Sequence, residues 1–138
     1  MKILFLDVDG VLNCKTTNFK TSLWPFDRHK AFLVGRILDK TDAKLVLSSS
    51  WRHHPDGVAT VEKHVFKVYD KTPVLSGTYN RGYEIKAWLD DHPGVEKYAI
   101  LDDDDDMIEG QVLFQTTWEE GLTEEIADQI IKYLLTPK

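Results

Sequence analysis

The chain has 138 residues, of which 42% are hydrophobic and 29% charged, so it is long enough for one packed domain of ordinary globular composition. Its net charge is −6, and no apolar run approaches the ~18 residues of a membrane span. These values argue against a bulk nucleic-acid binder and a membrane-spanning protein. The single cysteine, Cys14, excludes an internal disulfide and argues against a zinc cluster.

The negative charge is concentrated near the end of the sequence. Residues 1–101 hold 15 Lys and Arg against 12 Asp and Glu, whereas residues 102–138 hold 2 against 11. A local basic rim around an acidic site is compatible with this distribution. The sequence enters its first strand without a basic leader or a cleavage site, and it has one cysteine, so we expect a cytoplasmic protein.

Hydrophobic periodicity predicts alternating strands and helices along the chain. Short apolar runs predict strands at residues 3–6, 44–47, 73–75, 98–101 and 112–115. Apolar residues at helical spacing predict helices at 27–40, 58–69 and 81–91, and a last helix that begins at the N-cap Thr123. Strands separated by helices predict an α/β fold with a mostly parallel sheet and helices on both faces. We find no repeat or linker, and therefore expect one domain over residues 1–138.

Acidic and hydroxyl side chains follow three of the predicted strands. Asp7 and Asp9 follow the first strand, residues 48–50 are three serines after the second, and Asp102 and Asp103 follow the strand at 98–101. In open α/β sheets, ligands bind beyond the carboxyl ends of the strands. Neighbouring carboxylates repel each other unless a cation lies between them, and Asp is an established nucleophile toward phosphorus. The pattern predicts magnesium-dependent phosphoryl transfer.

Such a site also needs a hydroxyl for a phosphate oxygen and a fixed cation. The hydroxyl is Ser48 or Ser49, because a sequence defines the register of a strand only to within a residue or two. The cation is Arg81 or Lys86. Arg81 begins a predicted helix near the carboxyl edge of the sheet and its fork suits phosphate, whereas Lys86 lies more than one turn further along.

These strand ends resemble the four motifs of the haloacid dehalogenase-like (HAD) superfamily. Residues 7–12 (DVDGVL) resemble motif I and residues 45–49 motif II, while Arg81 or Lys86 and Asp102-Asp103 resemble motifs III and IV. Residues 45–52 and 81–85 also resemble small HAD domains of RNA repair proteins, which are relatives of the phosphatase half of polynucleotide kinase-phosphatases. The resemblance implies a three-layer Rossmann-like HAD fold.

The resemblance also implies roles for the acidic residues. Asp7 would be the nucleophile and a ligand of Mg²⁺. Asp9 would be the general acid and then the general base, and its backbone carbonyl would reach the metal. Asp102 or Asp103 would complete the magnesium shell.

Other residues would hold the substrate. The small-residue-before-Trp pattern of the relatives favours Ser49 over Ser48 for contact with the phosphoryl oxygens. Arg81 or Lys86 would neutralise Asp7 and the phosphoryl group, although the superfamily usually has a lysine there. The remaining positions where we expect substrate binding are Gly10, Ser50 and Arg52.

The spacing of the motifs leaves no room for a cap domain, because 40 residues separate Asp9 from Ser49 and 32 separate Ser49 from Arg81. By analogy with the superfamily, an open site favours macromolecular phosphoesters. We therefore expect nucleic-acid 3′-phosphate ends in RNA repair as substrates, with RNA-repair proteins as partners. Two alternatives stay open: a phosphatase of proteins or small phosphometabolites, and a non-catalytic phosphate- or Mg²⁺-binding module. The presence of Asp9 argues against the second, because binding alone needs no acid–base group.

Aromatic and basic residues flank the expected site. The loop at residues 13–25 contains Lys15, Phe19, Lys20 and Trp24, which either stack a terminal base and hold a backbone phosphate or pack the loop onto the sheet. His53 and His54 follow motif II, and we expect them on the surface of that loop, with the substrate entrance as the alternative.

Overall fold

Five strands form one parallel sheet in the computed structural model, which describes residues 1–17, 26–75 and 80–137. The strands are β1 (Lys2–Leu6), β2 (Lys44–Leu47), β3 (Val68–Lys71), β4 (Lys97–Asp102) and β5 (Leu113–Gln115). Their order is β3-β2-β1-β4-β5, and every neighbouring pair is parallel. The central position of β1 places its carboxyl end between those of β2 and β4.

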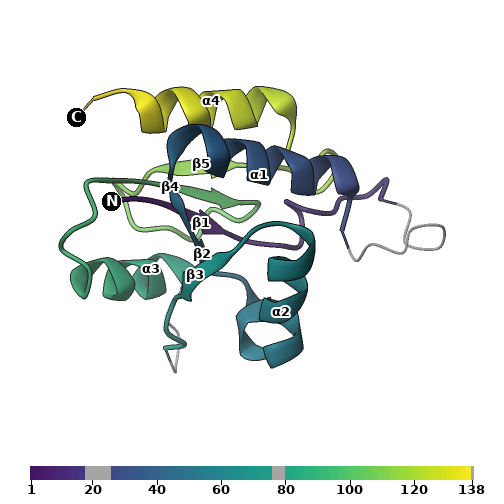
Figure 1. Cartoon of the computed structure of the whole chain (residues 1–138). Helices are drawn as coiled ribbons and strands as arrows, with labels where there is room; N and C mark the ends of the chain where they lie inside the picture. The colour runs from purple at the N-terminus through teal and green to yellow at the C-terminus, as the bar shows by residue number, and fades with distance from the viewer. Residues whose placement is uncertain (18–25, 76–79, 138) are drawn as a thin grey trace.

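Four helices cover the two faces of this sheet, and the short 3-10 helix η1 (Ser50–His53) follows β2. Figure 1 shows α1 (Arg28–Thr41) and α4 (Glu124–Leu135) side by side on one face, and α3 (Arg81–Asp90) on the other. The helix α2 (Pro55–His64) packs through Val61 into the same apolar cluster as α1 and α4. The predicted three-layer, Rossmann-like α/β fold is confirmed.

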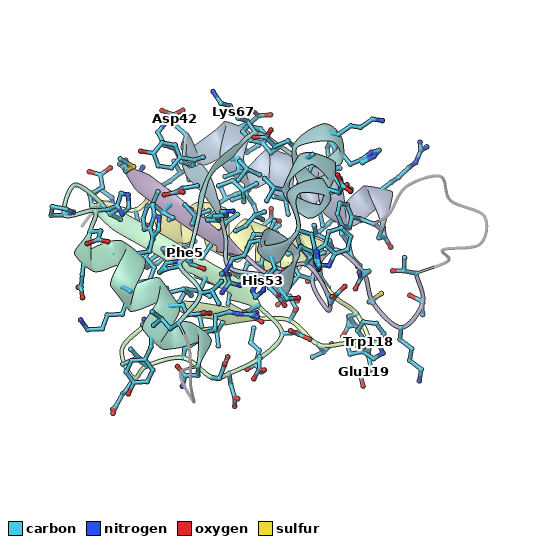
Figure 2. All side chains as sticks on the ribbon, turned by 90° about the horizontal axis from the view of Figure 1, so that it is seen from below. Phe5, Asp42, His53, Lys67, Trp118 and Glu119 are labelled. Atoms are coloured by element: carbon cyan, nitrogen blue, oxygen red, sulfur yellow. The ribbon has the colours of Figure 1, made fainter. Side chains whose placement is uncertain are left out.

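The central strand explains why polar residues gather at its end. Residues 3–6 of β1 are completely buried, because side chains alternate between a cluster under α1 and α4 and a second cluster under α3. Phe5 faces α3 and meets Trp88 edge to face at 5.5 Å between ring centroids (Figure 2). A segment buried on both faces is apolar throughout, so the first polar side chain after residues 3–6 is Asp7, where the strand stops.

Most predicted elements lie within one or two residues of the observed ones, but the segment at 58–75 was predicted wrongly. α2 ends at His64, residues 68–71 form β3, and no strand forms at 73–75. The predicted helix at 58–69 includes Val68 and Tyr69, whereas these β-branched and aromatic residues form the edge strand of the sheet. The ladder ends at Thr72, whose N–H donates to the carbonyl of Leu47, and Pro73 has no N–H to continue it.

Two further expectations on the fold concern the N-cap of the last helix and the absence of an inserted cap domain. Thr123 caps α4 as predicted: its hydroxyl accepts a hydrogen bond from the N–H of Ile126 at 3.3 Å. The regular structure in the described parts of residues 9–81 consists of α1, β2, η1, α2 and β3. None of these elements forms a separate cap domain over the site. No described helix has the length and apolar character to cross a membrane.

Candidate active site

Three polar side chains share one face of the sheet at its carboxyl edge. The ladder aligns three residues that face α3: Phe5, Val46 and Ile100. Side chains alternate along a strand, so two residues further on each strand again points to the α3 side. The residues there are Asp7, Ser48 and Asp102, and the N–H groups of Asp7 and Ser48 still bond to the neighbouring strands. The register of β1, β2 and β4 therefore assembles this site.

Three carboxylates form a compact cluster at that edge. One oxygen each of Asp7, Asp102 and Asp103 lies within 4.8 Å of the others; Asp7 and Asp102 are buried, and Asp103 is half-buried. Arg81, the first residue of α3, places Nη1 at 3.0 Å from Asp7 Oδ1 and 2.8 Å from Asp102 Oδ2. One guanidinium faces three carboxylates, so the cluster remains acidic.

The electrostatics of the cluster favour a cation. Burial, and secondarily the charge of Asp102, raise the pKa of Asp7 to about 8 although Arg81 opposes the shift. Burial and a hydrogen bond with Asp102 also raise the pKa of Asp103. Burial by itself would lower the pKa of Arg81, but Asp102 and Asp7 outweigh it and keep the guanidinium charged. Because carboxylate oxygens are the ligands that Mg²⁺ prefers, the residues present fit a divalent cation.

The raised pKa predicts that cation binding depends on pH. The folded pKa of Asp7, about 8, lies above the ordinary value of 3.8, so the metal-free fold holds a proton that the unfolded chain releases. The metal-free protein should lose stability as pH rises from about 4 to about 8. A cation must displace this proton, so Mg²⁺ affinity should rise by up to about tenfold per pH unit between about pH 6 and pH 8.

Thermal unfolding with and without Mg²⁺ at about pH 6 and about pH 8 measures this effect. Mg²⁺ should raise the Tm more at the higher pH. Asp105→Asn removes an exposed acid from the same loop and should keep the difference. Equal shifts at the two pH values would contradict the coupling between the proton and the metal.

The carboxylate of Asp9 is held apart from this cluster. Asn13 Nδ2 donates to Asp9 Oδ1 at 3.0 Å, and Trp51 Nε1 donates to Oδ2 at 3.4 Å. The side chain is exposed, whereas Asp7 beside it is buried. Sequence reasoning missed Asn13 and Trp51 as partners of Asp9. An Asn four residues after an Asp in a glycine turn is the one signal that points to Asn13. A metal contact of the Asp9 backbone carbonyl stays a prediction.

Gly10 shapes the turn between these acids, and substrate binding at Gly10 stays a prediction. Its N–H donates to Asn13 Oδ1 at 3.0 Å, and its carbonyl accepts from Thr116 Oγ1 at 2.7 Å. Its φ is 83°, a region that favours glycine, and a Cβ there would collide with the carboxylate of Asp103. Gly10 is thus required for the approach of Asp103 to Asp7.

Arg52 has a structural role, because its guanidinium is buried and hydrogen-bonded, and substrate binding by Arg52 stays a prediction. It is 5% exposed, and Nη2 lies 2.8 Å from Glu84 Oε1 of α3. Nε donates to the carbonyl of Thr72, and Nη1 donates to the carbonyls of Ser48 and Ser49. Nη2 also donates to the carbonyl of Pro73 at 3.5 Å, so all five guanidinium N–H groups have an acceptor within the described residues. It ties η1 to the end of β3 and to α3.

The two candidate hydroxyls differ in their surroundings. Ser49 Oγ accepts from the N–H of Trp51 at 3.1 Å and caps η1, so its side chain has a local role. Ser48 Oγ is buried, and the described residues offer it no hydrogen-bond partner; the same holds for Arg81 Nε. Buried polar atoms normally have a partner, so these two are available to a ligand. Ser50 is exposed at the start of η1.

The two candidate cations are separated by the structure. Arg81 lies against the carboxylates, whereas Lys86 stands on the outer side of α3 and pairs with Asp90 at 2.7 Å. The histidines expected on the surface, His53 and His54, are exposed. Lys15 is exposed as well. The other loop residues that were considered as base-stacking groups, Phe19, Lys20 and Trp24, lie outside the described residues.

The fold and the site define a class of protein. A parallel sheet of order β3-β2-β1-β4-β5, with carboxylates at the ends of β1 and β4, is the arrangement of a HAD-like domain. A family model described as the HAD domain in Swiss Army Knife RNA repair proteins matches residues 3–127, and the chain belongs to this family. No curated protein and no solved structure matches the chain.

Proposed function

We propose that this HAD domain is a magnesium-dependent phosphatase that hydrolyses phosphomonoesters through an aspartyl-phosphate on Asp7. The observation that carries the proposal is the separation of two acids: Asp7 lies in the carboxylate cluster beside Arg81, while Asp9 is held outside it. Membership of a HAD family supports the same reaction class. Mg²⁺ bound by Asp7, Asp102 and Asp103 would supply charge that offsets the phosphate dianion.

The proposed reaction has two steps, the transfer of the phosphoryl group to Asp7 and the hydrolysis of the aspartyl-phosphate. A carboxylate oxygen of Asp7 attacks phosphorus, the bond to the leaving oxygen breaks, and that oxygen takes its electron pair and a proton from Asp9. Asp9, now a carboxylate, accepts a proton from water as the water oxygen attacks the same phosphorus. The bond between Asp7 and phosphorus breaks, and inorganic phosphate leaves. Arg81 stabilises the charge on the phosphoryl oxygens in both steps.

Ser48 is the hydroxyl that we assign to the phosphoryl group, in place of Ser49. Ser48 shares the face of Asp7, and its Oγ has no described partner, whereas Ser49 caps η1. Ser48→Ala should lower kcat/KM by roughly 10- to 100-fold, as expected for the loss of a hydrogen bond to a charged group. Ser49→Ala should chiefly lower the free energy of unfolding, by about 1 kcal/mol. Steady-state kinetics and urea unfolding of both variants decide, and a larger loss of activity in Ser49→Ala would reverse the assignment.

The substrate that we propose is a 3′-phosphate end of RNA, acted on together with other RNA repair proteins. The family description supports RNA repair, and the site has no cap in the described parts of the chain. The test is phosphate release, with Mg²⁺ or with a chelator, from a 3′-phosphorylated RNA, a 5′-phosphorylated RNA and p-nitrophenyl phosphate. Release from the 3′ end supports the proposal. Release from the small ester alone refutes the RNA substrate, and no Mg²⁺-dependent release refutes the phosphatase.

A further inference from the structure

The position of Asp9 defines where the leaving group of a substrate must lie. A general acid acts only within hydrogen-bond reach of the oxygen that it protonates. Whatever is bonded to that oxygen therefore lies on the exposed side of Asp9, away from the carboxylate cluster. On that side, Asp9 Oδ2 meets the indole N–H of Trp51 at 3.4 Å.

Trp51 connects Asp9 to a pocket. The indole packs against Phe26, with 5.0 Å between ring centroids, and also borders a pocket of about 480 Å³ between η1 and the first turns of α2. His53, which lines the pocket, is exposed and is labelled near the middle of Figure 2. The lining side chains are those of Ser50, Trp51, His53, His54, Asp56 and Thr60. This volume is within the range of small-molecule sites.

We infer that this pocket binds the nucleoside that carries the terminal phosphate, so that the leaving oxygen is presented to Asp9. The inference rests on the proposed function and names the part of the substrate that the enzyme recognises. One indole and two imidazole rings are planar groups on which any base can stack. Stacking of this kind fits an enzyme that acts on ends of differing sequence.

The polar groups of the pocket also fit a nucleoside better than a second phosphate. The carboxylate of Asp56 lies in the first turn of α2 and accepts hydrogen bonds from ribose hydroxyls or base N–H groups, but repels an anion. Thr60 donates its hydroxyl proton to the carbonyl of Asp56 at 2.6 Å, so it offers acceptor lone pairs to the pocket. The lining residues supply no Lys or Arg.

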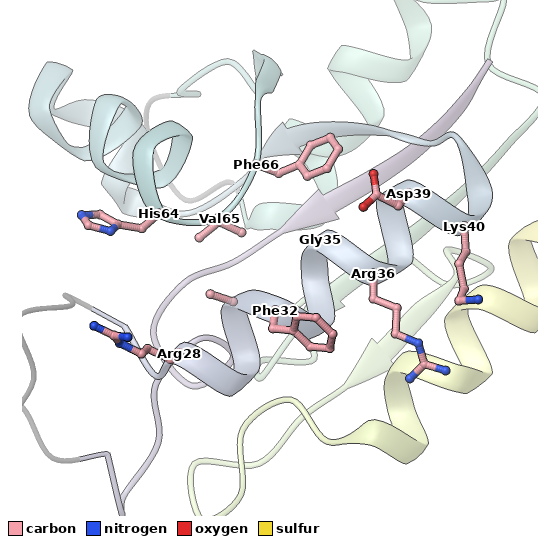
Figure 3. A pocket seen from close by; sticks show the side chains of 10 residues that line it. Arg28, Phe32, Gly35, Arg36, Asp39, Lys40, His64, Val65 and Phe66 are labelled. Carbon is pink, nitrogen blue, oxygen red and sulfur yellow. The ribbon is translucent and has the colours of Figure 1, made fainter.

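A second groove shows why contact with Asp9 is the deciding observation. About 640 Å³ lie between α1 and residues 64–66, where Phe32 is exposed among charged side chains (Figure 3). The described residues that line this groove include neither a member of the carboxylate cluster nor Asn13 or Trp51, which bond to Asp9. The pocket beside Trp51 is connected to the chemistry by a hydrogen bond from one of its own lining residues.

The kinetic test uses two substrates that differ in the leaving group: an RNA dinucleotide with a 3′-phosphate, and glycerol 2-phosphate. His53→Ala/His54→Ala removes two exposed rings from the pocket and leaves Asp9, Trp51 and the backbone caps in place. His29→Ala removes an exposed ring from α1 and is the matched control. The double variant should lose about fivefold or more in kcat/KM on the dinucleotide and nothing on glycerol 2-phosphate, while the control changes neither.

An equal loss on both substrates, or no loss on the dinucleotide, would overturn the inference while the phosphatase stands. A second measurement separates the failure of the pocket from the failure of the enzyme. Titration of the wild-type protein with the dephosphorylated dinucleotide should shift the indole N–H resonance of Trp51 in the NMR spectrum, and the double variant should weaken this shift. Shifts without any phosphatase activity would refute the proposed function and retain the nucleoside pocket. Activity on the dinucleotide without these shifts would refute the pocket.

Discussion

Asp7→Asn should abolish phosphatase activity and at the same time make the metal-free protein more stable. The amide of Asn cannot attack phosphorus, so kcat should fall by at least about 10³-fold. Burial and the charge of Asp102 raise the pKa of Asp7 to about 8, which means that its ionised form is unfavourable in the fold. Removing that charge should raise the free energy of unfolding by about 2 kcal/mol above pH 8, even though the contact with Arg81 is weakened.

The difference in stability between Asp7→Asn and the wild type should depend on pH. Below about pH 4, Asp7 is protonated in the folded and the unfolded chain, so its charge does not contribute and the two proteins should differ least. The advantage of the variant should grow as pH rises to about 8, where the folded wild-type Asp7 loses its proton. Urea unfolding in a chelator across this range measures it, with Asp105→Asn as an exposed control. A variant that is less stable than wild type at pH 8 would show that the ion pair with Arg81 outweighs the repulsion.

A charge that is needed for activity but lowers stability is expected where a fold brings several like charges into one active site. One oxygen each of Asp7, Asp102 and Asp103 lies within 4.8 Å of the others, and like charges this close destabilise the metal-free fold. Gly10 contributes to this arrangement, since any side chain there would displace Asp103. Residues selected for catalysis commonly reduce stability in this way.

The sequence predicts well those elements whose residue pattern is set mainly by the burial of apolar side chains. β1 is apolar at every position of its buried segment because it is the central strand of a parallel sheet. α4 carries both an N-cap at Thr123 and an apolar stripe. The boundary between α2 and β3 depends instead on the edge position of β3, which leaves Tyr69 exposed and Val68 half-buried. A local pattern does not contain that information.

The same distinction applies to the site. The carboxylates at the ends of β1 and β4 could be predicted because parallel topology brings such ends together. The role of Arg52 could not, since its burial depends on Glu84, which lies 32 positions further along the chain. From the sequence alone, the position of the charged Arg52 next to motif II suggests that it binds substrate. Only the tertiary structure shows that its donors are already used.

The partners of Asp9 and the two serines follow the same logic. Trp51 reaches Asp9 across 42 positions, through the turn that η1 makes after β2. The sequence places Ser48 and Ser49 side by side, and a shift of one residue changes which of them faces the α3 side of the sheet. The observed register of β1 and β2 decides that point, and it brings Ser48 to the face of Asp7.

Arg81→Ala should have the largest combined effect on stability and activity, and Lys86→Ala on the same helix is its matched control. Arg81 Nη1 is the cation within 3.0 Å of Asp7 and 2.8 Å of Asp102. Without it, two buried carboxylates lose their partner, and we expect a cost of about 3 kcal/mol in the metal-free protein. Lys86 pairs with Asp90 at the surface, so its removal should cost less than about 0.5 kcal/mol.

The two variants should differ further in activity, because Arg81 lies against Asp7, the proposed nucleophile, whereas Lys86 pairs with Asp90. The loss of its charge should lower kcat/KM by about 10³-fold, whereas Lys86→Ala should retain wild-type kinetics. Arg81→Lys keeps the charge but not the planar guanidinium whose Nη1 contacts both Asp7 and Asp102, so it should recover only part of the loss. Mg²⁺ should restore much of the stability of Arg81→Ala by neutralising the same carboxylates, but little of its activity. A larger kinetic effect of Lys86→Ala would contradict this assignment and favour Lys86 as the cation of the site.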